Sequence, residues 1–327
     1  MKDYGSPLAD PVLGGIMAAS FSRDSRALAD SRETKVMGTT AHITTVGSAP
    51  GLAVQLSDYL HELSGKWSRF LDDSEISQLN AHPEEFLKVS PETLRLIQVM
   101  IRGYAHTSRA FDPTLLPALI AEGYSHSLVT DKATSALPPS VAKRGNLAAI
   151  VVNETSVCLP VGTTLDSGGV GKGLAADLAV ESALEHGALG VMVEVGGDIR
   201  VMGSSPRGDT WRLAIEDPRD PSRRLSVVEL KDCGIATSTT MKRRFHAGGK
   251  ATHHIINPKT LTSADSDTLQ ASVIAPSAAD AEMFTKIAFV EGSSALMSAC
   301  TKRGFFAGCL LTDGSWITTP RWPGSHD

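Results

Sequence analysis

The sequence predicts an α+β protein, with two closely joined lobes of mixed sheet and helices around a ligand-binding cleft. Short β-branched runs alternate with amphipathic stretches along most of the chain. A chain of 327 residues is long enough to bury a large core. The sequence contains no internal repeat and no low-complexity tract, so it does not predict a solenoid or a fibrous protein.

The elements expected before residue 145 are one strand and three helices, at residues 41–46, 52–67, 91–108 and 113–121. The strand is short and β-branched, and the first helix carries leucines at helical spacing. Ser90 suits the N-cap of the second helix and Pro91 its first position. Asp112 suits the N-cap of the third helix. The polar, proline-containing stretch 123–145 predicts a loop.

The elements expected after residue 145 are strands at residues 148–152, 191–195, 211–216, 225–230, 271–275 and 307–312, and helices at residues 170–185 and 278–290. The first two of these strands are apolar enough to be buried, and the first helix lies between them. The strands at 211–216 and 225–230 flank a proline- and aspartate-containing turn, which predicts an antiparallel pair.

Residues 166–177 read DSGGVGKGLAAD, a glycine-rich turn that opens on Asp166 and runs into an apolar helix. Closely spaced glycines let backbone N–H groups approach an anion, and the following helix adds its positive N-terminal end. Lys172 adds a full positive charge. The segment predicts a phosphate or pyrophosphate site, with an ordinary strand-to-helix turn as the alternative. It is not a Walker A loop, because Gly173 follows the lysine, and its glycines are not spaced as in the Rossmann fingerprint.

Seven short segments follow one another in a recognisable order. They are Met37-Gly38-Thr39, DSEISQLN at 73–80, FDPTLLP at 111–117, the turn at 166–177, GGDIRVMG at 196–203, ATS at 236–238 and HIINPKT at 254–260. Together they resemble the motifs of the ApbE family, flavin transferases that move FMN from FAD onto a protein. The resemblance covers about residues 36–312, so it implies an ApbE-like fold with the flavin nucleotide in the cleft.

The resemblance also implies which residues contact FAD. They are Met37, Phe70, Ala110, Phe111, Asp112, Asp166, Lys172 and Ile256. Phe70 stands where the family usually has a tyrosine that stacks on the flavin, and phenylalanine keeps the stacking face. A plain core role is an equal alternative for Met37 and Phe70. Asp112 and Asp166 also suit helix caps.

For catalysis the resemblance implies His254 and Lys172. His254 is the expected base, which takes the proton of a threonine hydroxyl on an acceptor flavoprotein as that hydroxyl attacks phosphorus. Lys172 is expected to stabilise the negative charge that grows on the departing AMP. Asn257 stands where the family has an aspartate, so a charge beside the expected base is lost.

A magnesium site is the third implication of the resemblance. The family binds Mg²⁺ with a carbonyl of the glycine turn, here that of Gly169, and with an aspartate and a threonine one helical turn apart. Glu282 takes the aspartate position and Lys286 the threonine position, so the adjacent Thr285 is the expected substitute donor. The alternative for Glu282 and Lys286 is an ordinary helix pair of about 0.3 kcal/mol.

The sequence therefore predicts a Mg²⁺-dependent FAD:protein FMN transferase that releases AMP. An FAD pyrophosphatase that gives FMN and AMP is the nearest alternative, because water could replace the threonine. A non-catalytic FAD-binding or carrier protein is a further alternative, because Asn257 and Lys286 both depart from the motif near the chemistry.

Composition excludes other classes of partner and indicates a compartment. A net charge of −5 gives no electrostatic basis for binding nucleic acid, and no stretch approaches the ~20 apolar residues that span a membrane. Residues 1–34 are expected to be a flexible extension before a transferase domain at residues 35–320. The extension has neither a convincing export signal nor a cysteine for a lipid anchor, which predicts a cytoplasmic protein.

Overall fold

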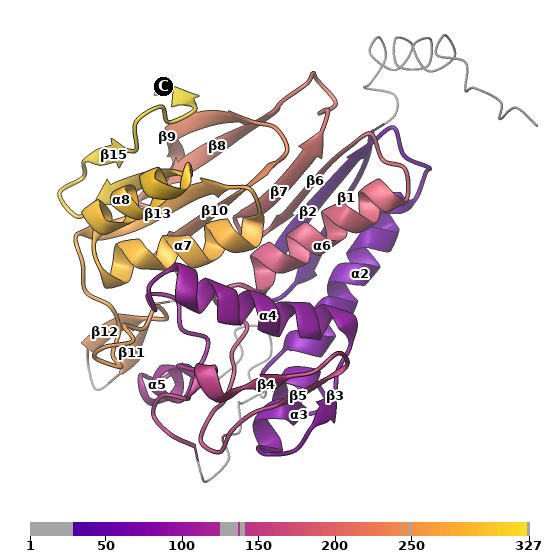
Figure 1. Cartoon of the computed structure of the whole chain (residues 1–327). Helices are drawn as coiled ribbons and strands as arrows, with labels where there is room; N and C mark the ends of the chain where they lie inside the picture. Colours follow the sequence, from indigo (N-terminus) through magenta and orange to yellow (C-terminus); the bar gives the residue numbers. More distant parts are fainter. Residues whose placement is uncertain (1–28, 125–136, 138–140, 243, 248–249, 326–327) are drawn as a thin grey trace, which may run out of the picture.

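The computed structural model describes residues 29–124, 137, 141–242, 244–247 and 250–325, and it confirms the expected α+β class (Figure 1). Its main element is an antiparallel sheet in the order β1-β2-β6-β7-β10-β13-β14-β15. These strands are β1 (Ala29–Val36), β2 (Thr39–Val46), β6 (Gly190–Val195), β7 (Asp198–Gly203), β10 (Cys233–Thr239), β13 (Thr268–Ala275), β14 (Phe306–Leu311) and β15 (Trp316–Thr318).

Helices cover one face of this sheet (Figure 1). They are α2 (Leu52–Trp67), α6 (Gly171–Glu185), α7 (Ala278–Val290) and α8 (Ser293–Arg303), and α4 (Pro91–His106) packs against α2 and α7. α6 and α7 are buried on nearly all sides, which explains their apolar sequences. The candidate site lies where α6 and α7 meet, at Lys172 of α6 and Glu282 of α7.

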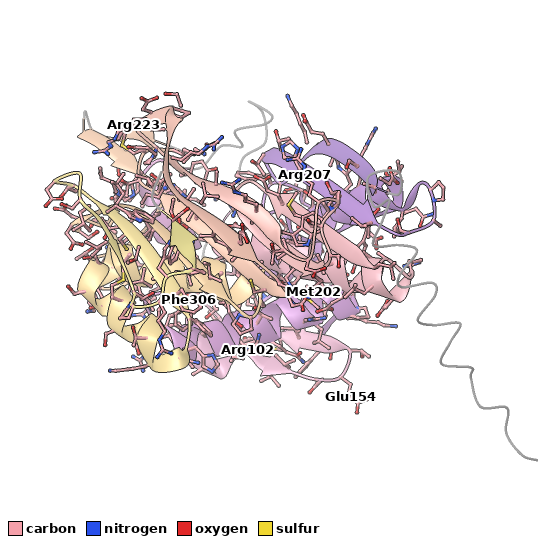
Figure 2. The ribbon with its side chains drawn as sticks, turned by 90° about the horizontal axis from the view of Figure 1, so that it is seen from above. Arg102, Glu154, Met202, Arg207, Arg223 and Phe306 are labelled. Atoms are coloured by element: carbon pink, nitrogen blue, oxygen red, sulfur yellow. The ribbon has the colours of Figure 1, made fainter. Side chains whose placement is uncertain are left out.

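A small second sheet packs on the opposite face. It consists of β8 (Trp211–Asp217), β9 (Asp220–Leu230) and β16 (Gly324–Ser325), and its order is β16-β9-β8. Trp211 and Val228 of this sheet share an apolar cluster with Ile235 and Ile274 of the main sheet. Seen from above, Arg223 of β9 and Arg102 of α4 lie at opposite edges of the molecule (Figure 2). The layers are therefore small sheet, main sheet and helices.

Shorter elements form the lower lobe in Figure 1. They are α3 (Glu75–Ala81), α5 (Leu116–Ala121), the 3₁₀ turn Leu147–Ala149, β3 (Leu87–Lys88), β4 (Val151–Val152), β5 (Ser156–Cys158), β11 (Arg244–Ala247) and β12 (Lys250–His253). Ile76 of α3 and Val157 of β5 belong to the same apolar cluster as Val191 of the main sheet. The two lobes thus share a core, as the sequence predicted.

Several boundaries agree with the sequence and others do not. α2 and α7 have the predicted bounds, and Ser90 caps α4 by accepting a hydrogen bond from Thr93 N. β1 occupies residues 29–36, so ordered structure reaches into the predicted flexible extension; residues 1–28 lie outside the described part. Most of the predicted loop at 123–145 also lies outside it.

Three local predictions were wrong for identifiable reasons. Asp112 Oδ1 accepts from Thr114 N and Oγ1 in a local turn, so α5 begins only at Leu116. The strand predicted at 148–152 shrinks to a two-residue edge strand with Val151 46% exposed. α8 was missed because it buries only Ser293, Leu296 and Cys300 and so shows no apolar stripe.

Gly173 allows α6 and α7 to cross at close range. A Cβ at this position would lie 2.5 Å from Ala278 O and 2.8 Å from Ala279 N, which are backbone atoms at the start of α7. Gly234 of β10 meets the same residue, Ala278, from the sheet side. The first turn of α7 is therefore held between two glycines, and a side chain at either position would displace it.

We expect Gly173→Ala to lower the free energy of unfolding by about 1–3 kcal/mol, the usual cost of overpacking. Gly65→Ala is the matched control, because Gly65 lies in α2 with nothing within 4 Å of the added Cβ. That control should stabilise the protein by about 0.5–1 kcal/mol through helix propensity. Urea unfolding of both variants measures the difference, and equal effects would disprove the close crossing.

Candidate active site

A buried cluster of charges joins α6, β7 and α7. Lys172, the second residue of α6, donates from Nζ to Asp198 Oδ2 and, at 2.8 Å, to Glu282 Oε1. The second carboxylate oxygen of Glu282 accepts a hydrogen bond of 2.8 Å from Gly173 N. The side chains of Asp198 and Glu282 are each 1% exposed, whereas that of Lys172 is 17% exposed. Of the three side chains in this cluster, that of Lys172 is therefore the one that keeps some exposure.

Local sequence explains how each side chain arrives there. Gly196 and Gly197 have φ values of 62° and 94°, which only glycine adopts readily, and their turn sets Asp198 at the start of β7. Ser277 caps α7 by accepting from Asp280 N, and Glu282 follows on the next turn. The N-cap residue of α6, Val170, gives no side-chain cap; Gly171 N instead donates to Ser167 O in the glycine turn at 2.7 Å, and Gly173 N donates to Glu282.

The charges in the cluster shift one another's pKa values. Burial would lower the pKa of Lys172, but Asp198 and Glu282 raise it above its ordinary value. Burial together with repulsion from Glu282 raises the pKa of Asp198 to about 7. Burial would likewise raise the pKa of Glu282, but Lys172 and Lys286 lower it below its ordinary value. Lys172 and Glu282 are thus both charged at neutral pH.

Lys286 provides a second ammonium on the same side of α7. Its Nζ donates to Ser238 Oγ at 3.0 Å, to Glu282 O at 3.1 Å and to Thr285 Oγ1 at 3.2 Å. The hydroxyl of Thr285 in turn donates to Glu282 O at 2.7 Å. Thr285 is fully buried, and Lys286 is partly exposed.

The glycine turn lies against these groups. A Cβ on Gly169 would come within 2.9 Å of the Phe111 ring and 3.6 Å of Lys286 Cε. A Cβ on Gly168 would come within 2.9 Å of Asp166 Oδ2. The structure therefore brings Gly169, Phe111, Lys172 and Glu282, which the sequence singled out separately, into one region.

Asp112 and Asp166 flank this region and are linked through the backbone. Asp166 N donates to Pro113 O at 2.9 Å, and Asp112 Oδ2 accepts from Arg144 Nε at 2.8 Å. Arg69 Nε lies 3.7 Å from Asp166 Oδ1. Neither aspartate caps α5 or α6, so the helix-cap alternatives do not hold.

Phe70 is not a plain core residue. It is partly buried, and the guanidinium of Arg69 lies 4.4 Å from its ring centroid. The same guanidinium lies 5.0 Å from the ring centroid of Tyr124. Arg69 was missed in the sequence, where a lone arginine before an aromatic residue carries no distinguishing signal.

The other predicted residues lie in turns or in apolar clusters. Met37 has a φ of 51° in the turn between β1 and β2, and Ala110 is buried in an apolar cluster with Ile255 and Phe284. Ile256 packs among Leu115, Ala118 and Leu119, which is an apolar contact with α5. His254 follows β12 directly, is partly exposed, and precedes the buried Ile255 and Ile256. Asn257 Oδ1 accepts from Lys259 N, so it supports the local turn.

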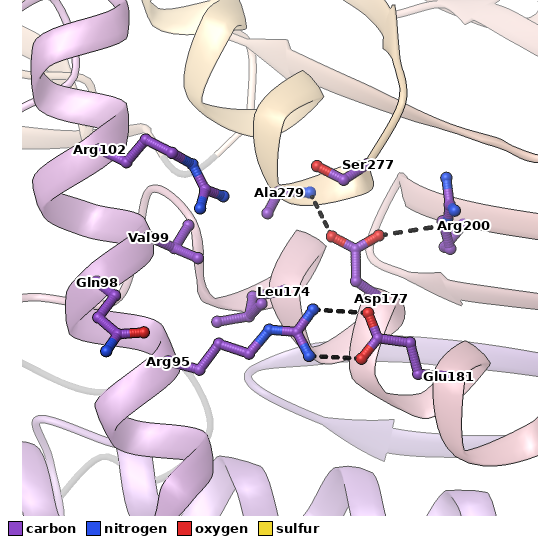
Figure 3. A pocket seen from close by; sticks show the side chains of 10 residues that line it. All are labelled: Arg95, Gln98, Val99, Arg102, Leu174, Asp177, Glu181, Arg200, Ser277 and Ala279. Atoms are coloured by element: carbon purple, nitrogen blue, oxygen red, sulfur yellow. Dashed lines mark hydrogen bonds and ion pairs between the residues drawn. The ribbon is translucent and has the colours of Figure 1, made fainter. Parts of the chain in front are cut away.

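A separate cavity of about 230 Å³ lies between α4, α6 and the start of α7 (Figure 3). Arg95, Arg102 and Arg200 line it, whereas Lys172, Asp198 and Glu282 do not. Asp177 of α6 faces it and accepts hydrogen bonds of 2.9 Å from Ala278 N and Ala279 N, with Arg200 Nε 3.6 Å away. Asp177 therefore joins α6 to the start of α7 through two hydrogen bonds.

Comparison with known proteins supports one family. The model of the ApbE family matches residues 37–307. The chain is 26% identical to the FAD:protein FMN transferase of Haemophilus influenzae, over 94% of this chain and 95% of that protein. It is 29% identical to the FAD:protein FMN transferase of Vibrio cholerae, over 68% of this chain and 70% of that protein.

Structures agree at the level of the fold. The ApbE protein of Thermotoga maritima matches with a TM-score of 0.78 and 24% identity, over 89% of this chain and 97% of that one. The flavin transferase ApbE of Vibrio cholerae matches with a TM-score of 0.74 and 24% identity, over the same shares. In the described part of the chain, no helix is both long enough and apolar enough to cross a membrane.

The free energy of unfolding should depend on pH through Asp177, which joins α6 and α7. Burial raises the pKa of Asp177 from its ordinary 3.8 to about 6. Between these values the native protein keeps a proton that the unfolded chain has released, so rising pH removes stability. Relative to Asp177→Asn, the free energy of unfolding of the unmodified protein should fall by about 2–3 kcal/mol between about pH 4 and about pH 6. Urea titrations across this range test it, and a constant difference would contradict it.

Proposed function

The chain belongs to the ApbE family and is a FAD:protein FMN transferase, and we propose that transfer takes place where Lys172, Asp198 and Glu282 meet. One observation carries this location: the side chain of Lys172 keeps limited exposure at the start of α6, beside the glycine turn, and two buried carboxylates fix its ammonium. Such an ammonium is a point charge for a phosphate, and the start of α6 adds the positive end of the helix dipole.

We assign the pyrophosphate of FAD to the glycine turn and Lys172. The contact between Gly169 and Phe111 supports flavin binding beside the turn, because the ring of Phe111 borders the same region. Met37, Phe70, Ala110, Asp112, Asp166 and Ile256 are the further proposed FAD contacts. For Phe70 the proposal includes stacking of the flavin on the ring face opposite Arg69.

The acceptor in this proposal is a threonine hydroxyl of a partner protein. Its oxygen forms a bond to the phosphorus of the FMN half of FAD, and the bond from that phosphorus to the bridging oxygen breaks. AMP leaves with the bridging oxygen, and His254 takes the proton of the hydroxyl. Lys172 stabilises the charge on the departing AMP, because its raised pKa keeps the ammonium protonated.

Mg²⁺ is the metal proposed for Gly169, Glu282 and Thr285, whose oxygens are hard donors. Glu282 already binds Lys172 and Gly173 N, however, and the hydroxyl of Thr285 accepts from Lys286. Within the described ranges, no group of three or more His, Cys, Asp and Glu could hold a metal ion. These oxygens are therefore better suited to an ion that enters bound to the phosphates of FAD than to an ion that the protein binds alone. When bound, that ion would neutralise pyrophosphate charge.

Mass spectrometry of an acceptor domain tests the function. Incubation of a threonine-containing acceptor with the protein, FAD and Mg²⁺ should add one FMN, about 438 Da, to the acceptor. An acceptor with that threonine replaced by alanine should gain nothing. Free FMN and AMP without an adduct would indicate a pyrophosphatase, and intact bound FAD would indicate a flavin carrier.

The role of Lys172 requires a test that separates chemistry from folding. Lys172→Met leaves two carboxylates buried without their partner, so it should cost about 3–5 kcal/mol of stability and abolish transfer. The double variant Lys172→Met/Asp198→Asn removes one of these charges and should recover part of the stability. Transfer by the double variant should stay at least about 100-fold below that of the unmodified protein. Recovery of transfer together with stability would show that Lys172 is only structural.

A further inference from the structure

Lys286 stands in an unusual position for a lysine on a buried helix. The neighbouring residues Thr285 and Ile287 are buried, whereas Lys286 is partly exposed and its Cε lies 3.6 Å from the Cβ position of Gly169. The end of its aliphatic stem therefore lies beside Gly169 of the glycine turn. This places the ammonium beside the segment that the proposed function assigns to the pyrophosphate.

The contacts of Lys286 differ from those of a surface helix pair. Its Nζ donates to the main-chain oxygen of Glu282, while the carboxylate of Glu282 binds Lys172 and Gly173 N. The other two acceptors are the hydroxyls of Ser238 and Thr285, from a different strand and the same helix. An ammonium is thus held by two hydroxyls and a carbonyl, which are hard oxygens of the kind that bind cations.

The charge balance explains what this ammonium adds. Asp198 and Glu282 are two potential negative charges, and Lys172 and Lys286 supply two positive ones. When Asp198 is ionised, the cluster without Lys286 would carry one excess negative charge and would repel a pyrophosphate. With Lys286 it is formally neutral, and the end of the Lys286 side chain lies beside Gly169 of the glycine turn.

We propose that Lys286 is a built-in cation of the nucleotide site, which binds the pyrophosphate of FAD and so lets the nucleotide bind without a divalent ion. The proposal rests on the proposed function, because it assumes that FAD binds at the glycine turn. While no Mg²⁺ is bound, the hydroxyl of Thr285 is a partner of the Lys286 ammonium. Mg²⁺ then adds to a site that already holds FAD.

FAD affinity, measured by flavin fluorescence in EDTA and again in Mg²⁺, tests this without relying on turnover. The unmodified full-length protein should bind FAD in EDTA, with an affinity that Mg²⁺ changes by less than about threefold. Lys286→Met should bind about 10- to 100-fold more weakly in EDTA, because the pyrophosphate then loses a nearby positive charge. Added Mg²⁺ should restore much of that loss, because the ion then supplies the missing charge.

Two further variants keep the result interpretable. Lys286→Arg preserves the charge and should retain most of the affinity in EDTA. Lys302→Met removes an exposed lysine from α8 and should leave FAD affinity unchanged. Thermal unfolding of each variant shows whether it is folded.

The outcomes separate this inference from the proposed function. If the unmodified protein binds FAD only when Mg²⁺ is present, or if Lys286→Met matches it in EDTA, the built-in cation is wrong while the FAD site stands. If the unmodified protein binds FAD in neither buffer, the proposed FAD site itself is wrong and this inference fails with it.

Discussion

The salt bridge of Lys172 with two buried carboxylates is the contact on which the rest of the site depends. Asp198 and Glu282 are almost inaccessible, and an unpaired charge there would cost several kcal/mol. The three residues come from α6, β7 and α7, so the fold must bring these elements together before the charges can be buried. The same requirement fixes the ammonium at the start of α6, beside the positive end of the helix dipole.

The crossing of α6 and α7 sets the geometry of that salt bridge. Gly173 permits backbone contact with Ala278, and Asp177, one turn further along α6, accepts hydrogen bonds from Ala278 N and Ala279 N. Glu282 follows one turn later on α7 and returns a carboxylate to Gly173 N. The two helices are thus joined on both sides of their closest approach. A rigid crossing of this kind holds a buried charge in place better than a loop could.

Sequence reasoning singled out residues of the candidate site but not how they fit together. The glycine turn and Lys172 stand out because a local motif marks them, Glu282 was singled out only through the family resemblance, and the bounds of α2 and α7 followed from apolar spacing. The pairing of Lys172 with Glu282, 110 residues away, leaves no local signal. Asp112 was taken for a helix cap because a local turn and a cap use the same side chain. Ile256 could not be separated from its apolar neighbours, because contact with α5 and contact with a flavin require the same residue type.

The oxygens around Lys286 illustrate why residue type alone does not decide between a metal and a lysine. Two hydroxyls and a carbonyl can bind either kind of cation, and the chain settles the choice by placing an ammonium among them. A tethered ammonium is always present, whereas a metal ion must be bound from solution at a cost that depends on its concentration. Lys286 also lowers the pKa of Glu282, which keeps that carboxylate charged and paired with Lys172. A lysine at this position therefore keeps a positive charge next to the glycine turn and the charge cluster whether or not an ion is bound.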